Sequence, residues 1–228
     1  MTKRAKMKQG LLEFPLGWGG RREGSGRKRQ AEWRRVSHKK KPELKKGCPP
    51  HVTVRLKAGL PSMRKKAAYK VLREVFAKAK DRFGFRLVHY SVMGNHIHAI
   101  VEADDQRALT KGMLGLQVRI ARGLNKLWGR AGGVFDDHYH HNQLITPREV
   151  RNALAYVLKN ARRHRIPHKL AIDHFASGPW FDGWTIEFEI TGHEGWQPPV
   201  TSAQSWLLKQ GWRRHGRIRP DEVPGRAA

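Results

Sequence analysis

The sequence is poor in several features that would each indicate a particular class of protein. Cys48 is the only cysteine among 228 residues, which excludes an intramolecular disulfide framework and a zinc site built from several cysteines. There is no apolar run of the length that crosses a bilayer, and no apolar segment follows the basic N-terminus as it would in a secretory signal. We therefore expect a protein of a reducing cytoplasm, without a membrane partner.

Acidic residues are also scarce. There are 19 Asp and Glu against 46 Lys and Arg, which gives a formal net charge of +27. The pI is about 11.1. Such an excess predicts a polyanionic partner, above all nucleic acid, because neutralising phosphates releases their counterions. The alternative is a basic surface that is simply solvated.

The basic residues are dense at the N-terminus. Residues 1–48 hold sixteen Lys and Arg and four Glu, with few aliphatic side chains, so we expect a largely disordered, DNA-binding tail. Within it, residues 19–29 mix glycines with basic side chains that could follow phosphates or enter a narrow minor groove. The candidate contacts are Arg21, Arg22, Arg27, Lys28 and Arg29. A plain solvated tail is the alternative.

Residues 49–165 show the periodicities of an α+β domain. The expected order is strand, helix, strand, strand, helix, strand, which is the ferredoxin-like βαββαβ arrangement with one antiparallel sheet and two helices on one side. The other face of the sheet is left for a ligand or further elements. The expected elements are a strand at 51–56, a helix from a Ser62 cap to Phe83-Gly84, strands at 85–93 and 96–102, a helix capped by Asp104 or Asp105, and a strand within 134–145.

Two histidines stand out in the third of these strands. Because side chains alternate along a strand, His96 and His98 point to the same face, close enough to hold one metal ion. Two strand histidines that pack or form hydrogen bonds are the alternative.

A second candidate lies in a helix that Thr146, Pro147 and Glu149 start with a capping box. Tyr156 lies outside the apolar stripe of this helix, and Asn160 falls beside it one turn later. A tyrosine that attacks a phosphodiester must lose its proton, and charge on the phosphate must be stabilised. A divalent ion held by the histidine pair and an amide oxygen could supply that stabilisation.

Taken together, these motifs resemble a known family. His96-Ile97-His98 is similar to the signature of HUH single-tyrosine transposases. Residues 156–164, Tyr-Val-Leu-Lys-Asn-Ala-Arg-Arg-His, look like the tyrosine-helix motif of the REP-associated tyrosine transposases (RAYT). The resemblance covers roughly residues 15–218. Further matching pieces are Gly24–Lys28 and residues 133–140, 178–184 and 205–212.

The resemblance implies a transposase that cleaves and rejoins single-stranded DNA beside a hairpin. In such an enzyme Tyr156 would form a 5′-phosphotyrosine and release a 3′-hydroxyl. His96, His98 and Asn160 would hold Mg²⁺ or Mn²⁺, and the protein would be bacterial and associated with the nucleoid. Lys159 departs from the family pattern, in which many relatives have asparagine, and is expected to change phosphate contacts.

Several further residues are candidates. His138 and His140 could help to deprotonate the tyrosine, although strand histidines more often bind phosphate or pack. We expect residues 166–228, a Trp/Arg-rich extension, to pack on the domain. The remaining candidate DNA contacts are Lys159, Arg162, Arg163, Arg213 and Arg214.

Other interpretations stay open. A domesticated or inactive relative would only bind hairpin DNA, and an RNA-binding module of similar topology would carry aromatic residues on its central strands. The protein could act as a monomer or as a homodimer in which Tyr156 completes the partner's site.

Overall fold

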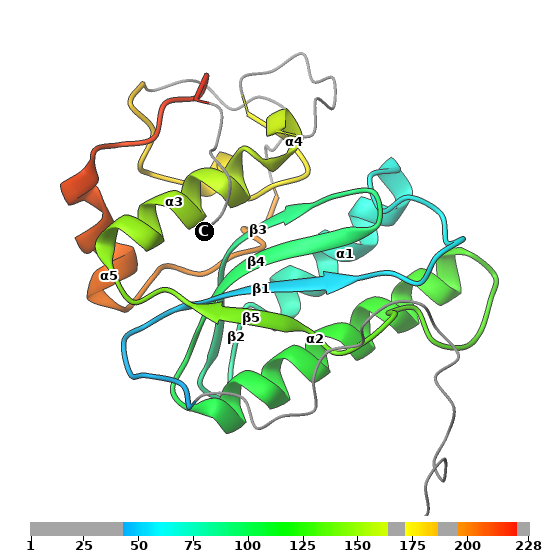
Figure 1. Ribbon diagram of the computed structural model, residues 1–228. Coiled ribbons are helices and arrows are strands. Elements are labelled where there is room, and N and C mark those ends of the chain that lie inside the picture. Colours follow the sequence, from blue (N-terminus) through cyan, green and yellow to red (C-terminus); the bar gives the residue numbers. More distant parts are fainter. Residues whose placement is uncertain (1–42, 164–171, 187–195, 223–228) are drawn as a thin grey trace, which may run out of the picture. The chain divides into compact units, whose positions relative to one another are not determined.

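The middle layer of the protein is a five-stranded antiparallel sheet (Figure 1). The computed structural model describes residues 43–163, 172–186 and 196–222, which belong to one compact unit. In the order β2-β3-β4-β1-β5, the strands are β1 (Pro50–Arg55), β2 (Asp81–Arg82), β3 (Phe85–Val92), β4 (His96–Ala103) and β5 (His140–Gln143). Without the short β2, this is the strand order of the ferredoxin-like fold, so the predicted fold class is confirmed.

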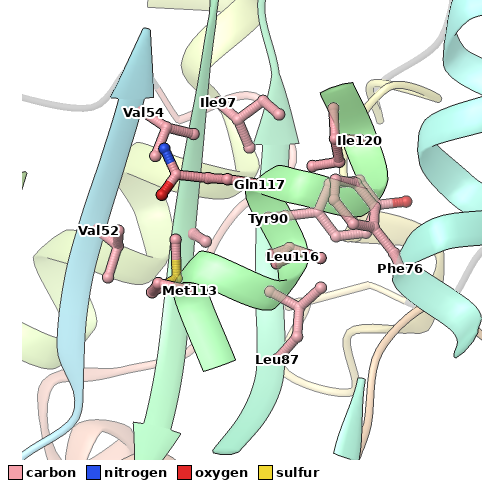
Figure 2. A pocket seen from close by; sticks show the side chains of 11 residues that line it. Val52, Val54, Phe76, Leu87, Tyr90, Ile97, Met113, Leu116, Gln117 and Ile120 are labelled. Atoms are coloured by element: carbon pink, nitrogen blue, oxygen red, sulfur yellow. The ribbon is translucent and has the colours of Figure 1, made fainter. Parts of the chain in front are cut away.

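One face of the sheet is covered by α1 (Lys66–Ala79) and α2 (Gln106–Leu127). Figure 2 shows the core between the sheet and α2, where a cavity of about 10 Å³ remains. A space of this size holds at most one water molecule, and its lining is almost wholly apolar, so it is a packing gap and not a ligand site. The residues around it include Val52, Val54, Phe76, Leu87, Tyr90, Ile97, Met113, Leu116, Gln117 and Ile120.

The opposite face of the sheet is covered by α3 (Pro147–Leu158). Its start is fixed by the predicted capping box: Glu149 N donates to Thr146 Oγ1 over 3.2 Å, and Thr146 N donates to Glu149 Oε2 over 3.0 Å. The apolar side of α3 packs against Val88 and Ile100 of the central strands. The face that the sequence leaves for a ligand or further elements therefore receives a helix.

The described parts of the C-terminal extension make hydrogen bonds with the sheet. Val92 N donates to Phe175 O over 2.8 Å, and Ser177 N donates to Tyr90 O over 2.9 Å, so part of the extension runs along β3. The buried carboxylate of Glu102 accepts hydrogen bonds from the backbone N–H groups at positions 204 and 205. These bonds tie the start of α5 to β4. The elements of the extension are η1 (Gly178–Trp180), α5 (Trp206–Lys209) and η2 (Gly211–His215).

Several predicted boundaries are wrong. Helix α1 begins at Lys66 rather than near Ser62, and it ends at Ala79. Phe83 and Gly84, with φ of 53° and 76°, form the turn between β2 and β3 instead of capping a helix. In the predicted strand at 134–145, only His140–Gln143 is a strand; earlier in the segment there is an isolated bridge between Leu56 and Phe135.

The N-terminal tail lies mostly outside the described residues, which begin at position 43. Residues 43–48, assigned to the tail from the sequence, already contact the sheet: the side chain of Gln143 accepts from Lys45 N and donates to Glu43 O. Among the helices that the structure describes, none has the length and apolar character needed to cross a membrane.

His89, buried under the extension with its Nδ1 3.3 Å from Ser177 Oγ, generates a prediction about stability. Burial lowers the pKa of His89 to about 4, from an ordinary value near 6.5. Between these values the unfolded chain binds a proton that the folded chain does not, so stability falls as the pH falls through this window. Replacing His89 by Leu should therefore reduce the stability lost between pH 7 and pH 5 by about 2 kcal/mol.

Urea denaturation at both pH values measures this difference. His215→Gln is the matched control, because its side chain is exposed, and it should leave the difference unchanged. An equal loss of stability in wild type and His89→Leu would contradict the assignment.

Candidate active site

The site is centred on a contact between α3 and β4. The hydroxyl of Tyr156 lies 3.4 Å from Nε2 of His98, a residue 58 positions earlier in the chain. The two rings meet edge to face, with centroids 5.0 Å apart and an interplanar angle of 82°. Because α3 lies across the sheet, the candidate nucleophile reaches the predicted metal ligand within one chain.

The two histidines share a face of β4, as their spacing predicts. The ring centroids of His96 and His98 are 4.8 Å apart, and their planes are almost perpendicular. Nδ1 of His96 lies 2.8 Å from Oδ1 of Asn95. Nδ1 of His98 lies 3.0 Å from Oγ1 of Thr53 and 3.2 Å from Nε2 of His51.

Strand β1 supplies three residues that the sequence analysis missed. Thr53 pairs with His98 and Arg55 pairs with His96, so both, together with His51, lie on the face that carries the histidine pair. The ring of His51 is 5.2 Å from that of His98 and 5.7 Å from that of Tyr156. Their alternation with the apolar positions of residues 51–56 places these residues on the polar face of the strand. The sequence does not show which strand lies beside that face.

Burial sets the charge of this cluster. It lowers the pKa of His51 to about 4, so this imidazole is neutral at pH 7. Thr53 and His51 therefore bring neutral groups to the ring of His98. A cation at the site would meet no competing positive charge from His51.

Asn160 is fully buried, and both polar atoms of its amide lack a hydrogen-bond partner among the described residues. An unsatisfied buried amide costs stability, so such a group calls for an explanation. The continuous helix predicted through Asn160 is interrupted: α3 ends at Leu158, Lys159 leaves helical geometry, and Asn160 begins α4 (Asn160–Arg163). Asn160 therefore lies at the start of a separate helical turn, four positions after Tyr156.

These donors fit a divalent ion. Two imidazoles from one strand and an amide oxygen make three neutral ligands, which would leave coordination positions for substrate oxygens. Within the described ranges there is no cluster of three or more His, Cys, Asp and Glu side chains able to hold a metal. The histidine pair would therefore need a third ligand of another kind, and the buried Asn160 amide is the predicted one.

Lys159, predicted to contact phosphate, is buried. The side chain is only 2% exposed, with Nζ 5.7 Å from the ring of Trp184, so it is not on a surface that a phosphate can reach. The backbone of Lys159 is outside helical geometry (φ −114°, ψ 15°). The pKa of Glu222 is lowered mainly by hydrogen bonds from Arg151 and in smaller part by the Lys159 charge.

The accessory histidines have different positions. His140 pairs with Thr53, so it lies on the site's face of the sheet, next to β1, and is exposed. His138 is exposed and precedes β5, where its backbone N–H donates to Asp137. A part in catalysis stays a prediction for both residues.

Two candidate DNA contacts of the extension, Arg213 and Arg214, lie on η2, which packs against α3. Arg213 pairs with Asp182 over 2.9 Å, and Arg214 stacks 4.8 Å from the exposed ring of Trp206. The side chains of Arg162 and Arg163, and all of Arg21, Arg22, Arg27, Lys28 and Arg29, lie outside the described part of the chain.

The orphaned amide generates a prediction. Replacing Asn160 by Ala should leave the free energy of unfolding unchanged or raise it by about 1 kcal/mol, because a buried group without hydrogen bonds is removed. Urea denaturation measures the change, and exposed Asn152→Ala on α3 controls for helix propensity. A loss above about 1 kcal/mol relative to the control would mean that the amide holds the fold together.

Comparison with known proteins identifies a family and a similar fold. The family model described as "Transposase IS200 like" matches residues 45–160. The fold is similar to that of a REP-associated tyrosine transposase solved with a REP hairpin (TM-score 0.50, 16% identity, 62% of this chain and 82% of that chain).

A further crystal structure, of a candidate transposase from Deinococcus radiodurans R1, matches 49% of this chain and 87% of that chain at 16% identity and a TM-score of 0.34. No curated protein matches the sequence. The family model spans half of the chain, including the histidine pair, Tyr156 and Asn160, and the chain therefore belongs to the IS200-like, single-tyrosine transposase family.

Proposed function

We propose that the protein cleaves and rejoins single-stranded DNA beside a hairpin, through a 5′-phosphotyrosine formed on Tyr156 and with a divalent metal ion. The observation that carries the proposal is the 3.4 Å approach of the Tyr156 hydroxyl to Nε2 of His98. This contact places a hydroxyl nucleophile beside a candidate metal ligand from a different element of the fold.

The chemistry is a transfer between oxygens. Tyr156 Oη loses its proton and bonds to phosphorus, while the bond from phosphorus to the 3′ oxygen breaks and that oxygen takes up a proton. The phosphate then links the tyrosine to the 5′ end of the downstream DNA. Attack by a 3′-hydroxyl on this linkage reverses the step and rejoins a strand.

The residues around the tyrosine suit this transfer. His96, His98 and Asn160 would hold Mg²⁺ or Mn²⁺, which when bound supplies charge stabilisation to the phosphate. Arg55 is exposed and lies opposite His96 on the neighbouring strand, where its guanidinium can contact a substrate phosphate. Thr53 and His51 hold the ring of His98 from its other side.

Hairpin DNA is proposed as the partner on two grounds. A REP-associated transposase with a similar fold was solved with a REP hairpin. The net charge of +27 gives this chain the electrostatic attraction that a folded polyanion requires. A protein that only binds the hairpin is the alternative, and cleavage distinguishes the two.

The first test compares wild type with Tyr156→Phe on single-stranded DNA containing palindromes from the flanks of the gene. We expect a covalent protein–DNA band that requires Mn²⁺ or Mg²⁺, disappears with EDTA and is lost in the variant, because phenylalanine has no nucleophilic oxygen. Denaturing gel electrophoresis detects the band.

Tyr139→Phe is the matched control, since this tyrosine is buried in the core on the α2 side of the sheet, where its hydroxyl lies 3.4 Å from Thr110 Oγ1. It should keep wild-type cleavage. Cleavage that survives Tyr156→Phe would assign the chemistry to another nucleophile. Tight hairpin binding without cleavage under either metal would support the alternative.

The contact within one chain also predicts a site in cis. Tyr156 and His98 of the same chain approach each other, so a mixture of Tyr156→Phe and His98→Gln proteins should not recover cleavage. Mixing the two purified variants before adding DNA measures this. Recovery towards one quarter or more of wild-type activity would show that the tyrosine of one chain serves the histidines of another.

A further inference from the structure

Each histidine of the pair has a neighbouring side chain on its Nδ1 atom. In His96 this neighbour is Oδ1 of Asn95 at 2.8 Å, and in His98 it is Oγ1 of Thr53 at 3.0 Å. A neutral imidazole carries one N–H and one lone pair, so the group that contacts Nδ1 decides which nitrogen can bind a metal.

The choice is determined for His96 by the chemistry of its neighbour. A carboxamide oxygen only accepts hydrogen bonds. The hydrogen therefore resides on Nδ1 of His96, and its lone pair is on Nε2. Asn95 is the residue directly before β4, so the strand start itself places this acceptor beside the ring.

For His98 the contacts on both ring nitrogens are consistent with the same tautomer, with the hydrogen on Nδ1. Thr53 lies directly opposite in the β1–β4 register, and its hydroxyl can accept a hydrogen bond from Nδ1–H. The other nitrogen, Nε2, faces the hydroxyl of Tyr156, which can donate to a lone pair there. Nε2 of His51 also lies 3.2 Å from this Nδ1, and its own tautomer decides whether it donates or accepts there.

We infer that Asn95 and Thr53 are positioning residues that hold His96 and His98 in the Nδ1–H tautomer, so that both present Nε2 to one divalent ion. The metal part of this inference rests on the proposed function, whereas the tautomers are a property of the metal-free protein. The role is the one that hydrogen-bond partners commonly have behind metal-binding histidines.

The tautomers are measured first, by ¹⁵N NMR of metal-free protein with labelled histidine, at a pH where the rings are neutral. Spectra of His96→Gln and His98→Gln assign the two rings. We expect protonated Nδ1 and unprotonated Nε2 in both, and loss of this pattern for His98 in Thr53→Val. Protonated Nε2 in wild-type His96 or His98 would overturn the inference.

Metal binding is measured second, as Mn²⁺ affinity by calorimetry and electron paramagnetic resonance. Thr53→Val keeps shape and β-propensity but removes the acceptor, and should weaken Mn²⁺ binding on the order of 10- to 100-fold. Thr53→Ser restores the hydroxyl and should bind close to wild type. Asn95→Ala and Asn95→Asp form the corresponding pair at His96, the aspartate keeping an acceptor oxygen.

The two measurements separate the two claims. Mn²⁺ affinity in Thr53→Val equal to that of wild type would overturn the role of Thr53. Urea denaturation verifies that the variant is folded. Wild type that binds no Mn²⁺ yet shows Nδ1–H in both rings would refute the metal site and leave the tautomers established. If wild type binds Mn²⁺ but carries Nε2–H in the metal-free rings, the tautomer inference is refuted and the metal site is kept.

Discussion

The packing of α3 across the sheet is the constraint on which the site depends. The capping box at Thr146 and Glu149 fixes where the helix starts, and the contacts with Val88 and Ile100 fix how it lies. These two conditions determine the height of Tyr156 above β4, and hence its contact with His98. A one-residue shift of the helix would rotate the tyrosine by about 100° and separate the two groups.

The extension supports this arrangement from outside. Helix α3 packs against η2 on the side that the sheet leaves open, and Arg151 of α3 is paired with Glu222 near the end of the described chain. Glu102 holds the start of α5 on the same strand that carries the histidines. The tyrosine helix is therefore held between two layers, which gives the candidate nucleophile a defined position before any DNA binds.

The site also retains groups that a purely structural core would avoid. The side-chain amide of Asn160 is buried without a hydrogen-bond partner among the described residues, and His51 is held neutral by burial beside His98. Polar groups in such environments cost stability, and they are typical of functional sites. The layer on the other side of the sheet is apolar and closely packed. One face of the sheet therefore carries this core, and the other carries the candidate site.

Much of this could be predicted from local patterns. Alternation placed His96 and His98 on one face, and the Thr146 capping box located α3, because both depend on neighbours within a few residues. Boundaries failed where long-range pairing decides, as at the Phe83 turn, which joins two strands instead of ending a helix. Thr53 could not be assigned for the same reason, since its role depends on the β1–β4 register.

Mapping the covalent adduct tests the central claim most directly. Trypsin cleavage after Arg151 and Lys159 releases residues 152–159, a peptide whose single tyrosine is Tyr156. After reaction with single-stranded hairpin DNA and nuclease digestion, tandem mass spectrometry should find a nucleotide joined through its 5′ phosphate to Tyr156. An adduct on another residue, or cleaved DNA with no adduct at all, would contradict the account.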